Sequence, residues 1–283
     1  MTEIKTITYK ASTKLRKPGK LIGVMFQDLL AGHELGMQLA VRDIKSQYRQ
    51  AMLGILWAFL FPLANTAVWL FIKQAGITNI QDTSIPYPVY ILTGTTLWAI
   101  FMESVNAPLM QANAARSMLA KINFPKESLI LAGIYKTLFN ATIKSIIILG
   151  GLLIVGISIE YTIVFYPFAI CSLILAGTGF GLILTPIGML YKDVGKGVPV
   201  VMQFLMYISP VVYPIPADGW AKKLFILNPL TCLITTARDF LTGVFPQNIT
   251  IFLVIIVCIS ILLLLSWYLY RISMPIIIER ISS

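Results

Sequence analysis

Catalytic chemistry in this chain is limited by its single histidine. His33 is the only histidine among the 283 residues, and the sequence contains neither a GxxxxGK[ST] phosphate loop nor an HExxH helix. No Ser/His/Asp set can form without His33 as its base. The three cysteines, Cys171, Cys232 and Cys258, show no CxxC spacing and stand in apolar surroundings. We therefore expect no catalytic residue, no metal site and no cofactor bound by this chain.

Three charged residues fall within or beside long apolar stretches: Glu103, Lys136 and Lys144. Each costs about 2.5–3.5 kcal/mol if it is left unpaired at the centre of a bilayer. We expect Glu103 and Lys136 to lie near the inner interface, where pairing or snorkelling removes most of this cost. A proton relay would need a chain of buried carboxylates or histidines, which the sequence does not offer.

The segment before the first apolar stretch predicts an amphipathic helix that lies in the membrane interface. Its apolar side chains recur at helical spacing: Met37, Val41, Ile44 and Tyr48. A polar strip runs beside them: Gln38, Arg42, Lys45 and Arg49. A plain membrane anchor is one interpretation. Leu35 and Leu39 lie off the apolar stripe, which indicates that the helix also touches protein.

The composition is that of a polytopic membrane protein with one domain. The chain is 57% hydrophobic and 12% charged, with a mean hydropathy of +0.82. Its net charge of +10 is explained by Lys and Arg in cytoplasmic loops and does not indicate nucleic-acid binding. Because a span needs about 20 apolar residues, we predict an all-α fold with six transmembrane helices, near 53–73, 87–110, 133–157, 163–190, 198–213 and 249–270.

The fifth and sixth spans are separated by a segment of mixed polarity. The fifth ends in the proline-rich stretch 209–216, and prolines remove helix donors. Residues 220–241 are too polar to span and too apolar for an ordinary loop, so they predict two short re-entrant or interfacial helices, broken at Asn228-Pro229. Irregular backbone at membrane depth is tolerated where it lines a wet cavity. We expect this segment at the outer mouth of a pathway.

The distribution of basic residues predicts that both termini are cytoplasmic. Residues 1–20 are polar and basic and contain no signal peptide. With the amino terminus inside, the inner segments hold 16 Lys and Arg residues and the outer segments hold four. This is the asymmetry of the positive-inside rule.

The inner loop between the second and third predicted spans, residues 113–127, combines helix-forming residues with a proline stop. As a short cytoplasmic helix it would offer Met118, Leu119, Ile122 and Phe124 to a partner. As a bare loop it would be uninformative. Both interpretations are open from the sequence.

Aromatic side chains gather in the first and fifth predicted spans. The candidates are Trp57, Phe61 and Trp69 in the first, and Phe204, Tyr207 and Tyr213 in and after the fifth. Such rings usually serve packing or the interfacial belt. They could also form stacking surfaces for sugar rings in a wide pathway.

Short motifs in a fixed order carry a resemblance to a known family. They are Tyr48-Arg49-Gln50, Leu53-Gly54, Leu56-Trp57-Ala58, Pro62-Leu63, Lys121, Phe124-Pro125-Lys126-Glu127, Lys192-Asp193-Val194, Gln203, Ser209-Pro210-Val211, Tyr213-Pro214, Asn228-Pro229-Leu230, Arg238 and Gly243. Over about residues 30–270 the chain resembles the permeases of polysaccharide-exporting ABC transporters, the type II (ABC-2) exporters of O-antigen, teichoic acid and capsule.

The resemblance implies a subunit that is not itself an enzyme. Residues 28–283 would form the permease domain after a basic cytoplasmic tail, 1–27. Two permeases would pair in the cytoplasmic (inner) membrane with two ATP-binding subunits, which bind ATP and Mg. The substrate would be a lipid-linked polysaccharide that crosses a channel lined by spans one and five, with residues 216–243 as gate helices.

Two sets of contact residues follow from this resemblance. The loop helix, at 113–124, would match the family's coupling helix seated in the ATPase, with Arg116, Met118, Leu119, Lys121, Ile122 and Phe124. The basic residues Arg42, Lys45 and Arg49 are candidates, from their charge alone, to meet the lipid diphosphate at the entrance.

Three alternatives stay open from the sequence. An ABC-2 permease for a small lipid or drug would share the fold, although the first-span signature is of the polysaccharide type. A membrane-embedded glycosyltransferase or acyltransferase would need clustered Asp, Glu or His at the interface, which the chain lacks. A passive channel would not need the loop helix.

Overall fold

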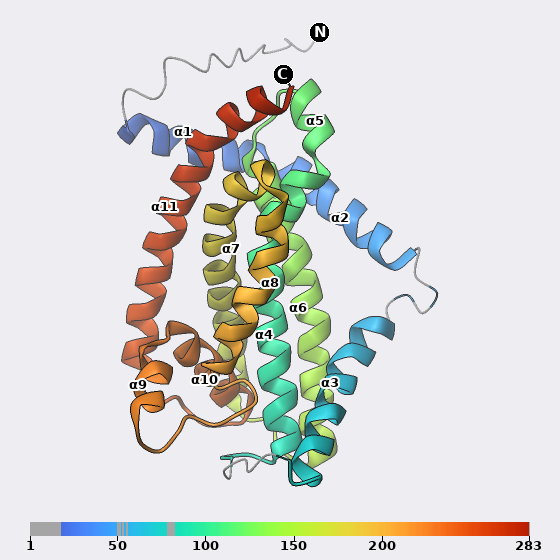
Figure 1. Ribbon diagram of the computed structural model, residues 1–283, viewed down its shortest axis with the longest axis vertical. Coiled ribbons are helices and arrows are strands. Elements are labelled where there is room, and N and C mark those ends of the chain that lie inside the picture. Colours follow the sequence, from blue (N-terminus) through green and yellow to red (C-terminus); the bar gives the residue numbers. More distant parts are fainter. Residues whose placement is uncertain (1–17, 50–51, 53, 55, 78–82, 283) are drawn as a thin grey trace.

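The computed structural model describes residues 18–49, 52, 54, 56–77 and 83–282. This part of the chain is helical and contains no strand (Figure 1). The helices in chain order are α1 (Pro18–Ala31), α2 (His33–Arg49), α3 (Leu56–Gln74), α4 (Tyr87–Ala114), α5 (Arg116–Lys121), α6 (Glu127–Val155), the 3-10 helix η1 (Tyr161–Phe165), α7 (Tyr166–Leu190), α8 (Lys192–Tyr207), α9 (Trp220–Leu227), α10 (Pro229–Leu241) and α11 (Ile249–Ser282).

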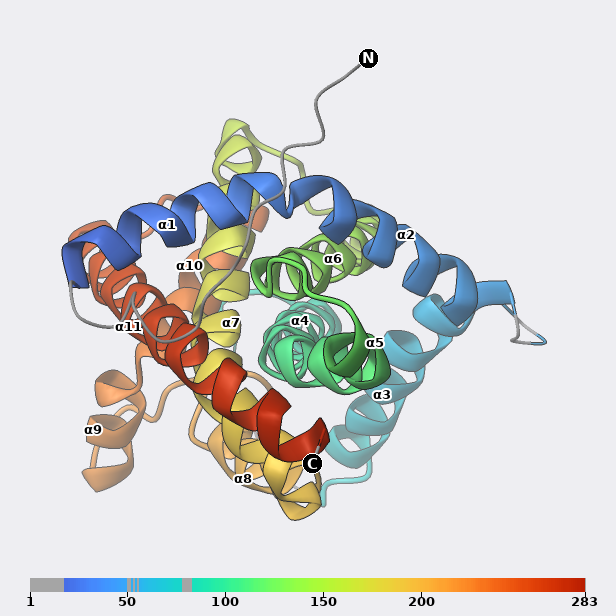
Figure 2. The same cartoon turned by 90° about the horizontal axis from the view of Figure 1, so that it is seen from above.

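Helix α4 is the centre of the bundle and contacts α3, α6, α7 and α8 (Figure 2). Glycines on α7 let the two backbones approach closely. A Cβ at Gly177 would lie 2.5 Å from Ser104 Cβ, and one at Gly181 would lie 2.9 Å from Pro108 Cδ. Small residues at such crossings are how helices pack tightly inside membranes.

Some of the buried polar side chains of α4 keep hydrogen bonds to their own helix. The hydroxyl of Thr95 donates to the Ile91 carbonyl at 2.7 Å, and that of Ser104 donates to the Ile100 carbonyl at 2.8 Å. Bonding to the carbonyl one turn earlier satisfies a hydroxyl within its own helix. A helix with several such residues can therefore stand in the interior of the bundle.

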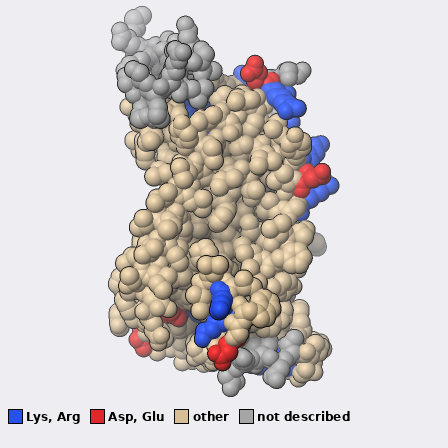
Figure 3. All heavy atoms as spheres, turned by 60° about the vertical axis from the view of Figure 1, so that its left-hand side comes forward, with Lys and Arg blue, Asp and Glu red and all other residues tan. Residues whose placement is uncertain are grey.

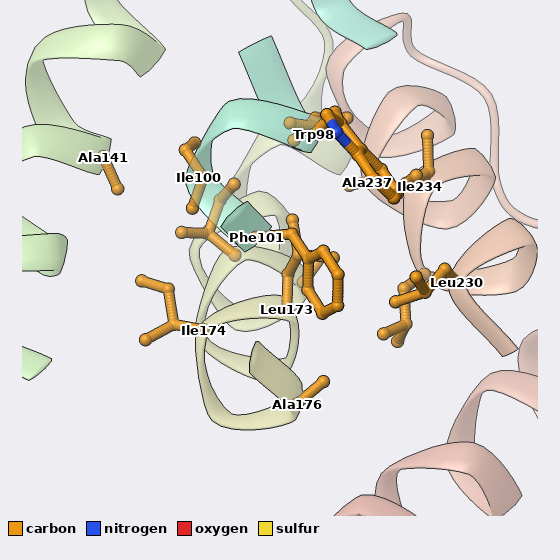
Figure 4. Packing of buried hydrophobic residues seen from close by; sticks show 14 of the residues in the cluster. Trp98, Ile100, Phe101, Ala141, Leu173, Ile174, Ala176, Leu230, Ile234 and Ala237 are labelled. Carbon is orange, nitrogen blue, oxygen red and sulfur yellow. The ribbon is translucent and has the colours of Figure 1, made fainter. Parts of the chain in front are cut away.

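The main hydrophobic core joins α4 and α7 to the short helix α10. Figure 4 shows Trp98 and Phe101 of α4 and Leu173 of α7 on one side, and Leu230 and Ile234 of α10 facing them. All five side chains are buried. Helix α10 is thus fixed by packing as well as by its connections along the chain.

Four helical segments are long and apolar enough to cross a membrane: α3, α6, Tyr161–Leu190 and α11 over Ile249–Arg280. The bent pair of α9 and α10 would make five. On the face shown in Figure 3, charged side chains gather along the upper right edge and near the lower end, and most of the surface between them is uncharged. The predicted all-α polytopic membrane class is confirmed, but the count of six spans is not.

The predicted fifth span, 198–213, is misplaced. Helix α8 runs from Lys192 to Tyr207, six residues earlier at each end. At 1.5 Å per residue its 16 residues extend about 24 Å, less than the hydrocarbon core of about 30 Å. The helix ends where it does because Pro210 has no N–H and restricts the residue before it.

The limits of the other predicted spans also differ from the observed helices. Helix α6 begins at Glu127 instead of 133, and α11 continues to Ser282 instead of ending at 270. Both extensions carry charged residues, which an apolar count assigns to loops. Leu53, near the start of the predicted first span, lies outside the described residues.

The predicted break at Asn228-Pro229 is confirmed. Helices α9 and α10 meet there at 77°. Asn228 is the N-cap of α10, because its side chain accepts a hydrogen bond from the Leu230 amide at 3.0 Å. Pro229 occupies the first helical position, which needs no amide donor.

The amino-terminal helices pack along the end of the bundle that carries α5 (Figure 1). Residues 1–17 of the predicted tail lie outside the described residues, whereas 18–27 belong to α1, in which Leu21 and Met25 are buried. In α2, Leu39 is buried against the bundle, as its position off the apolar stripe predicted. Met37 and Val41 of that stripe are exposed.

Candidate functional site

A cavity of about 900 Å³ lies between the C-terminal end of α2 and helices α3, α4 and α6. Its wall on α3 is aromatic. Trp57 and Phe61 stand one helical turn apart and their rings stack, with centroids 5.1 Å apart and planes at 29°. Along α4 the lining runs from Thr95 to Gln111, which is about 24 Å of helix. The cavity is therefore elongated along the bundle.

An ion pair and its hydrogen bonds cross this cavity. Lys144 Nζ lies 2.7 Å from Glu103 Oε2, with side chains only 17% and 24% exposed. Asn140 also donates to Glu103. Tyr48 of α2 in turn donates to Asn140 Oδ1 at 3.2 Å. The network ties α2, α4 and α6 together and removes the expected cost of an unpaired Glu103.

Lys136 lines the same cavity from α6. None of the carboxylates in the described part of the chain forms an ion pair with it.

Burial and the nearby Glu103 raise the pKa of the Tyr48 hydroxyl above its ordinary value. Across the described ranges, no group of three His, Cys, Asp or Glu side chains could hold a metal ion.

The six predicted channel aromatics fall in three places. Trp57 and Phe61 line the cavity. Trp69 packs edge-to-face on Tyr213, with ring centroids 5.8 Å apart. Phe204 and Tyr207 are 70% and 46% exposed on α8. Within one chain, therefore, only Trp57 with Phe61 and Trp69 with Tyr213 are brought together.

The basic residues predicted to meet a diphosphate, Arg42, Lys45 and Arg49, are exposed on α2. None of them lines the cavity, which Gln47 and Tyr48 reach instead. Arg42 is also neutralised in part, because its Nη2 lies 2.8 Å from Asp43 Oδ1. In the sequence, Lys136 is visible as a charged residue in an apolar stretch, but no pattern there assigns it to a site.

The coupling helix was predicted over residues 113–124. The observed helix is shorter, and only some of the predicted contact residues are exposed. Helix α5 covers Arg116–Lys121. Leu119 and Phe124, which were predicted to be available to a partner, are buried in the core with residues of α11, so that prediction is wrong for these two. Met118 is partly buried. The exposed members of the predicted set are Arg116, Lys121 and Ile122.

A second cavity, of about 580 Å³, lies between α1, the segment 119–126 and the end of α11. Arg271 of α11 is at its edge. Its Nη1 donates to both carboxylate oxygens of Glu127 at 2.6 Å, and its Nη2 pairs with Asp28 of α1. Burial and the neighbouring Arg271 guanidinium lower the pKa of Lys126. Residues far apart in sequence form this cluster, so no local pattern predicts it.

Helix α10 lies in the half of the bundle away from α5 (Figure 1), and its Arg238 is buried. Its Nε donates to Thr93 Oγ1 at 3.1 Å and its Nη2 donates to the Pro210 carbonyl at 3.0 Å. Gly94 makes room for this arrangement, because a Cβ there would collide with the Val211 carbonyl and lie 2.6 Å from Arg238 Nη2. Arg238 thus joins α4, α10 and the turn after α8.

The sequence profile described as ABC-2 type transporter matches residues 35–242, which is most of the chain. The chain belongs to the ABC-2 type transporter family. Helices α2 to α10 carry this ABC-2 region. It includes the aromatic cavity, α5 and Arg238, whereas Asp28 and Arg271 lie outside it.

Three relatives are named for O-antigen export, polysialic acid transport and capsule polysaccharide export. The chain is 24% identical over 220 residues to the O-antigen export system permease protein RfbA of Myxococcus xanthus, covering 75% of this chain and 82% of that protein. It is 26% identical over 210 residues to the polysialic acid transport protein KpsM of Escherichia coli, covering 71% and 78%. It is 22% identical over 261 residues to the capsule polysaccharide export inner-membrane protein CtrC of Neisseria meningitidis, covering 89% and 94%.

The longest of these matches, to CtrC, reaches beyond the ABC-2 region and covers 89% of the chain. A membrane-spanning transport protein is therefore what the family and the apolar helices establish together.

Proposed function

We propose that this chain is the permease subunit of an ABC transporter that exports a lipid-linked polysaccharide of the O-antigen, capsule or teichoic acid type across the cytoplasmic membrane. The observation that carries this proposal is the ABC-2 match over residues 35–242 together with relatives named for O-antigen and capsule export. Because the chain has no phosphate-binding loop, ATP and Mg belong to a separate ATP-binding subunit.

The proposed topology has six crossings, by α3, α4, α6, α7, α8 together with the turn that follows it, and α11, within a permease domain of residues 28–283. Helix α1 and the end of α11 lie at the same end of the bundle as α5 (Figure 1), which supports an even number of crossings. The excess of Lys and Arg in the inner segments supports cytoplasmic termini. The exposed Met37 and Val41 support an α2 that rests in the membrane interface.

The proposed assembly is a homodimer with two ATP-binding subunits. Only 6% of the span in α3 is buried within one chain, and α8 exposes Phe204 and Tyr207. Both helices contact α4. These faces support a second copy that would complete a channel with all six aromatics in its wall: Trp57, Phe61, Trp69, Phe204, Tyr207 and Tyr213.

The proposed contacts with partner and substrate lie on two surfaces. Arg116, Lys121 and Ile122 of the α5 region are exposed for docking of the ATP-binding subunit. Arg42, Lys45 and Arg49 are exposed on α2, where they would attract the diphosphate of the lipid carrier from the membrane surface.

Purification and complementation test the proposal together. We expect the chain to copurify with an ATP-binding subunit in equal amount from its native membrane. Deleting its gene should remove a surface polysaccharide and leave the lipid-linked precursor inside, and the wild-type chain should restore export. A purified chain without an ATPase, and a deletion strain with unchanged surface glycans, would overturn the proposal.

A further inference from the structure

The aromatic cavity contains one cation that no carboxylate of the described residues neutralises. Three charged residues of the described chain line it: Glu103, Lys136 and Lys144. Glu103 and Lys144 form an ion pair at 2.7 Å, so their charges cancel. Lys136 forms no ion pair with any carboxylate among the described residues. The cavity therefore keeps a net positive charge, which Lys136 carries.

Lys136 is placed in the half of the cavity nearer to α5. It lies nine residues after Glu127, where α6 begins, or about 14 Å along the helix. Helix α2 crosses α6 at this level, because His33 Nδ1 lies 2.6 Å from the Tyr135 hydroxyl and Tyr48 bonds to Asn140. Gln111 lines the same half from α4. Polar donors and a cation are thus gathered next to the helix that we place in the membrane interface.

The rest of the lining is suited to something apolar or to flat rings. The stacked pair Trp57 and Phe61 forms the wall on α3, and Val68 lies further along the same helix. A ligand that fits this cavity is therefore anionic at one end and elongated or apolar beyond it. A lysine ammonium binds a phosphate group as a point charge with three donors.

We propose that Lys136 binds the phosphate of a polyprenyl diphosphate carrier inside this cavity, after its capture at the α2 surface. The site rests on the proposed export function, since it names where the carrier of that substrate would be held. It differs from the exposed Arg42, Lys45 and Arg49, which lie outside the cavity. A phospholipid headgroup carries the same phosphate chemistry, so the test separates the two sources.

The test uses the permease together with its ATP-binding subunit in nanodiscs of phosphatidylcholine. Binding of radiolabelled undecaprenyl diphosphate is measured for the wild type, Lys136→Gln, Lys136→Arg and Lys73→Gln. We expect Lys136→Gln to weaken binding about tenfold or more, because it removes a charge-assisted donor. Lys136→Arg should stay within about threefold, because the charge remains. Lys73 is the matched control, since its Nζ lies 4.2 Å over the Tyr87 ring and outside the cavity.

Two results would overturn the inference. One is equal affinity of the wild type and Lys136→Gln when both give the same thermal unfolding midpoint. The other is displacement of the probe by phosphatidylglycerol as readily as by unlabelled undecaprenyl diphosphate, which would assign the site to bilayer phospholipid. Export of the glycan is measured in a separate assay from binding of the probe. A complex that binds the probe through Lys136 but exports no glycan contradicts the proposed function alone, and one that exports with Lys136→Gln and unchanged binding contradicts the site alone.

Discussion

Arg238 lies over the ring of Tyr90, with its Cζ 3.7 Å from the ring centroid. The same guanidinium donates to the carbonyls of Tyr90 and Pro210, at 3.3 and 3.0 Å. A buried cation is thus held by a π-face and by carbonyl dipoles. Because these groups belong to α4, α10 and the turn after α8, movement of the bent α9–α10 pair away from α4 would break this set of contacts.

Replacing Arg238 by alanine should destabilise the isolated permease. The change leaves the Pro210 carbonyl without this donor and opens a cavity among α4 and α10. One hydrogen bond to a charged group contributes about 1.5–3 kcal/mol, so we expect a loss of at least that size in the free energy of unfolding. Unfolding by denaturant in micelles measures it. Lys223→Ala, at an exposed position of α9, is the control, and equal stability of the two variants would contradict the structural role of Arg238.

Gly94→Ala tests the closeness of the same turn to α4. The added Cβ would collide with the Val211 carbonyl, which is backbone and cannot rotate away. We expect a cost of about 1–3 kcal/mol, as for other overpacked interiors, and a lower thermal midpoint. Gly150→Ala on α6 is the matched control, because a Cβ there meets no atom within 4 Å. If both alanine variants unfold alike, the turn does not approach α4 as described.

Local sequence signals predicted the break between α9 and α10 better than they predicted where the spans begin and end. The break between α9 and α10 is visible in Asn228-Pro229 because capping and the missing proline donor act within a few residues. The limits of α8 were not visible, since Lys192 and Asp193 belong to the helix although they are polar. Hydropathy measures affinity for lipid and does not say where a helix begins.

The candidate site was predictable in its residue types but not in its partners. Helical spacing identified the faces of α2, yet only the packing on α6 shows that Leu39 is buried while Arg42 is exposed. Leu119 was assigned to a partner because it is apolar in a loop, whereas the end of α11 buries it. The chain supplies this cover from more than a hundred residues away, which no local pattern reports.

The pair Glu103 and Lys144 should behave as a coupled unit. Either Glu103→Gln or Lys144→Gln leaves the other member of the pair without its opposite charge, and we expect each to cost up to about 3 kcal/mol, the lower end of the range for breaking a buried ion pair. The double variant leaves two neutral amides and should cost less than the sum of the two single changes. Unfolding free energies of all four proteins measure the coupling. Strict additivity would show that the 2.7 Å pair contributes nothing.

Arg271 should control how firmly α1 is held to the bundle. Its guanidinium bonds to Glu127 at 2.6 Å and pairs with Asp28, so Arg271→Gln leaves two acidic side chains facing each other. We expect faster hydrogen exchange across α1 (Pro18–Ala31), because local opening needs less free energy when anchoring contacts are lost. Lys196→Gln, at an exposed position of α8, is the control. Unchanged protection of α1 in Arg271→Gln would show that other contacts, such as those of buried Leu21 and Met25, are enough to hold it.

The exposed and buried residues of the α5 region should separate partner binding from stability. Ile122→Asp and Lys121→Glu change only exposed positions, so we expect them to weaken copurification of the ATP-binding subunit while the thermal midpoint of the permease stays the same. Leu119→Ala removes buried contacts and should cost about 2–5 kcal/mol of stability before it affects the partner. Quantifying the ATPase retained per permease, beside the thermal midpoint of each variant, distinguishes the two effects.

Lys223→Glu on α9 is the matched charge reversal, since it lies at the opposite end of the bundle from α5 (Figure 1). If it reduces copurification as much as Lys121→Glu does, net charge and not position explains the loss, and α5 is not the docking element. If Ile122→Asp retains the partner fully, the contact lies elsewhere on the end of the bundle that carries α5. If Ile122→Asp and Lys121→Glu reduce copurification of the ATPase and Lys223→Glu does not, the ATPase docks on the exposed part of the α5 region, because that is the surface which the two variants change.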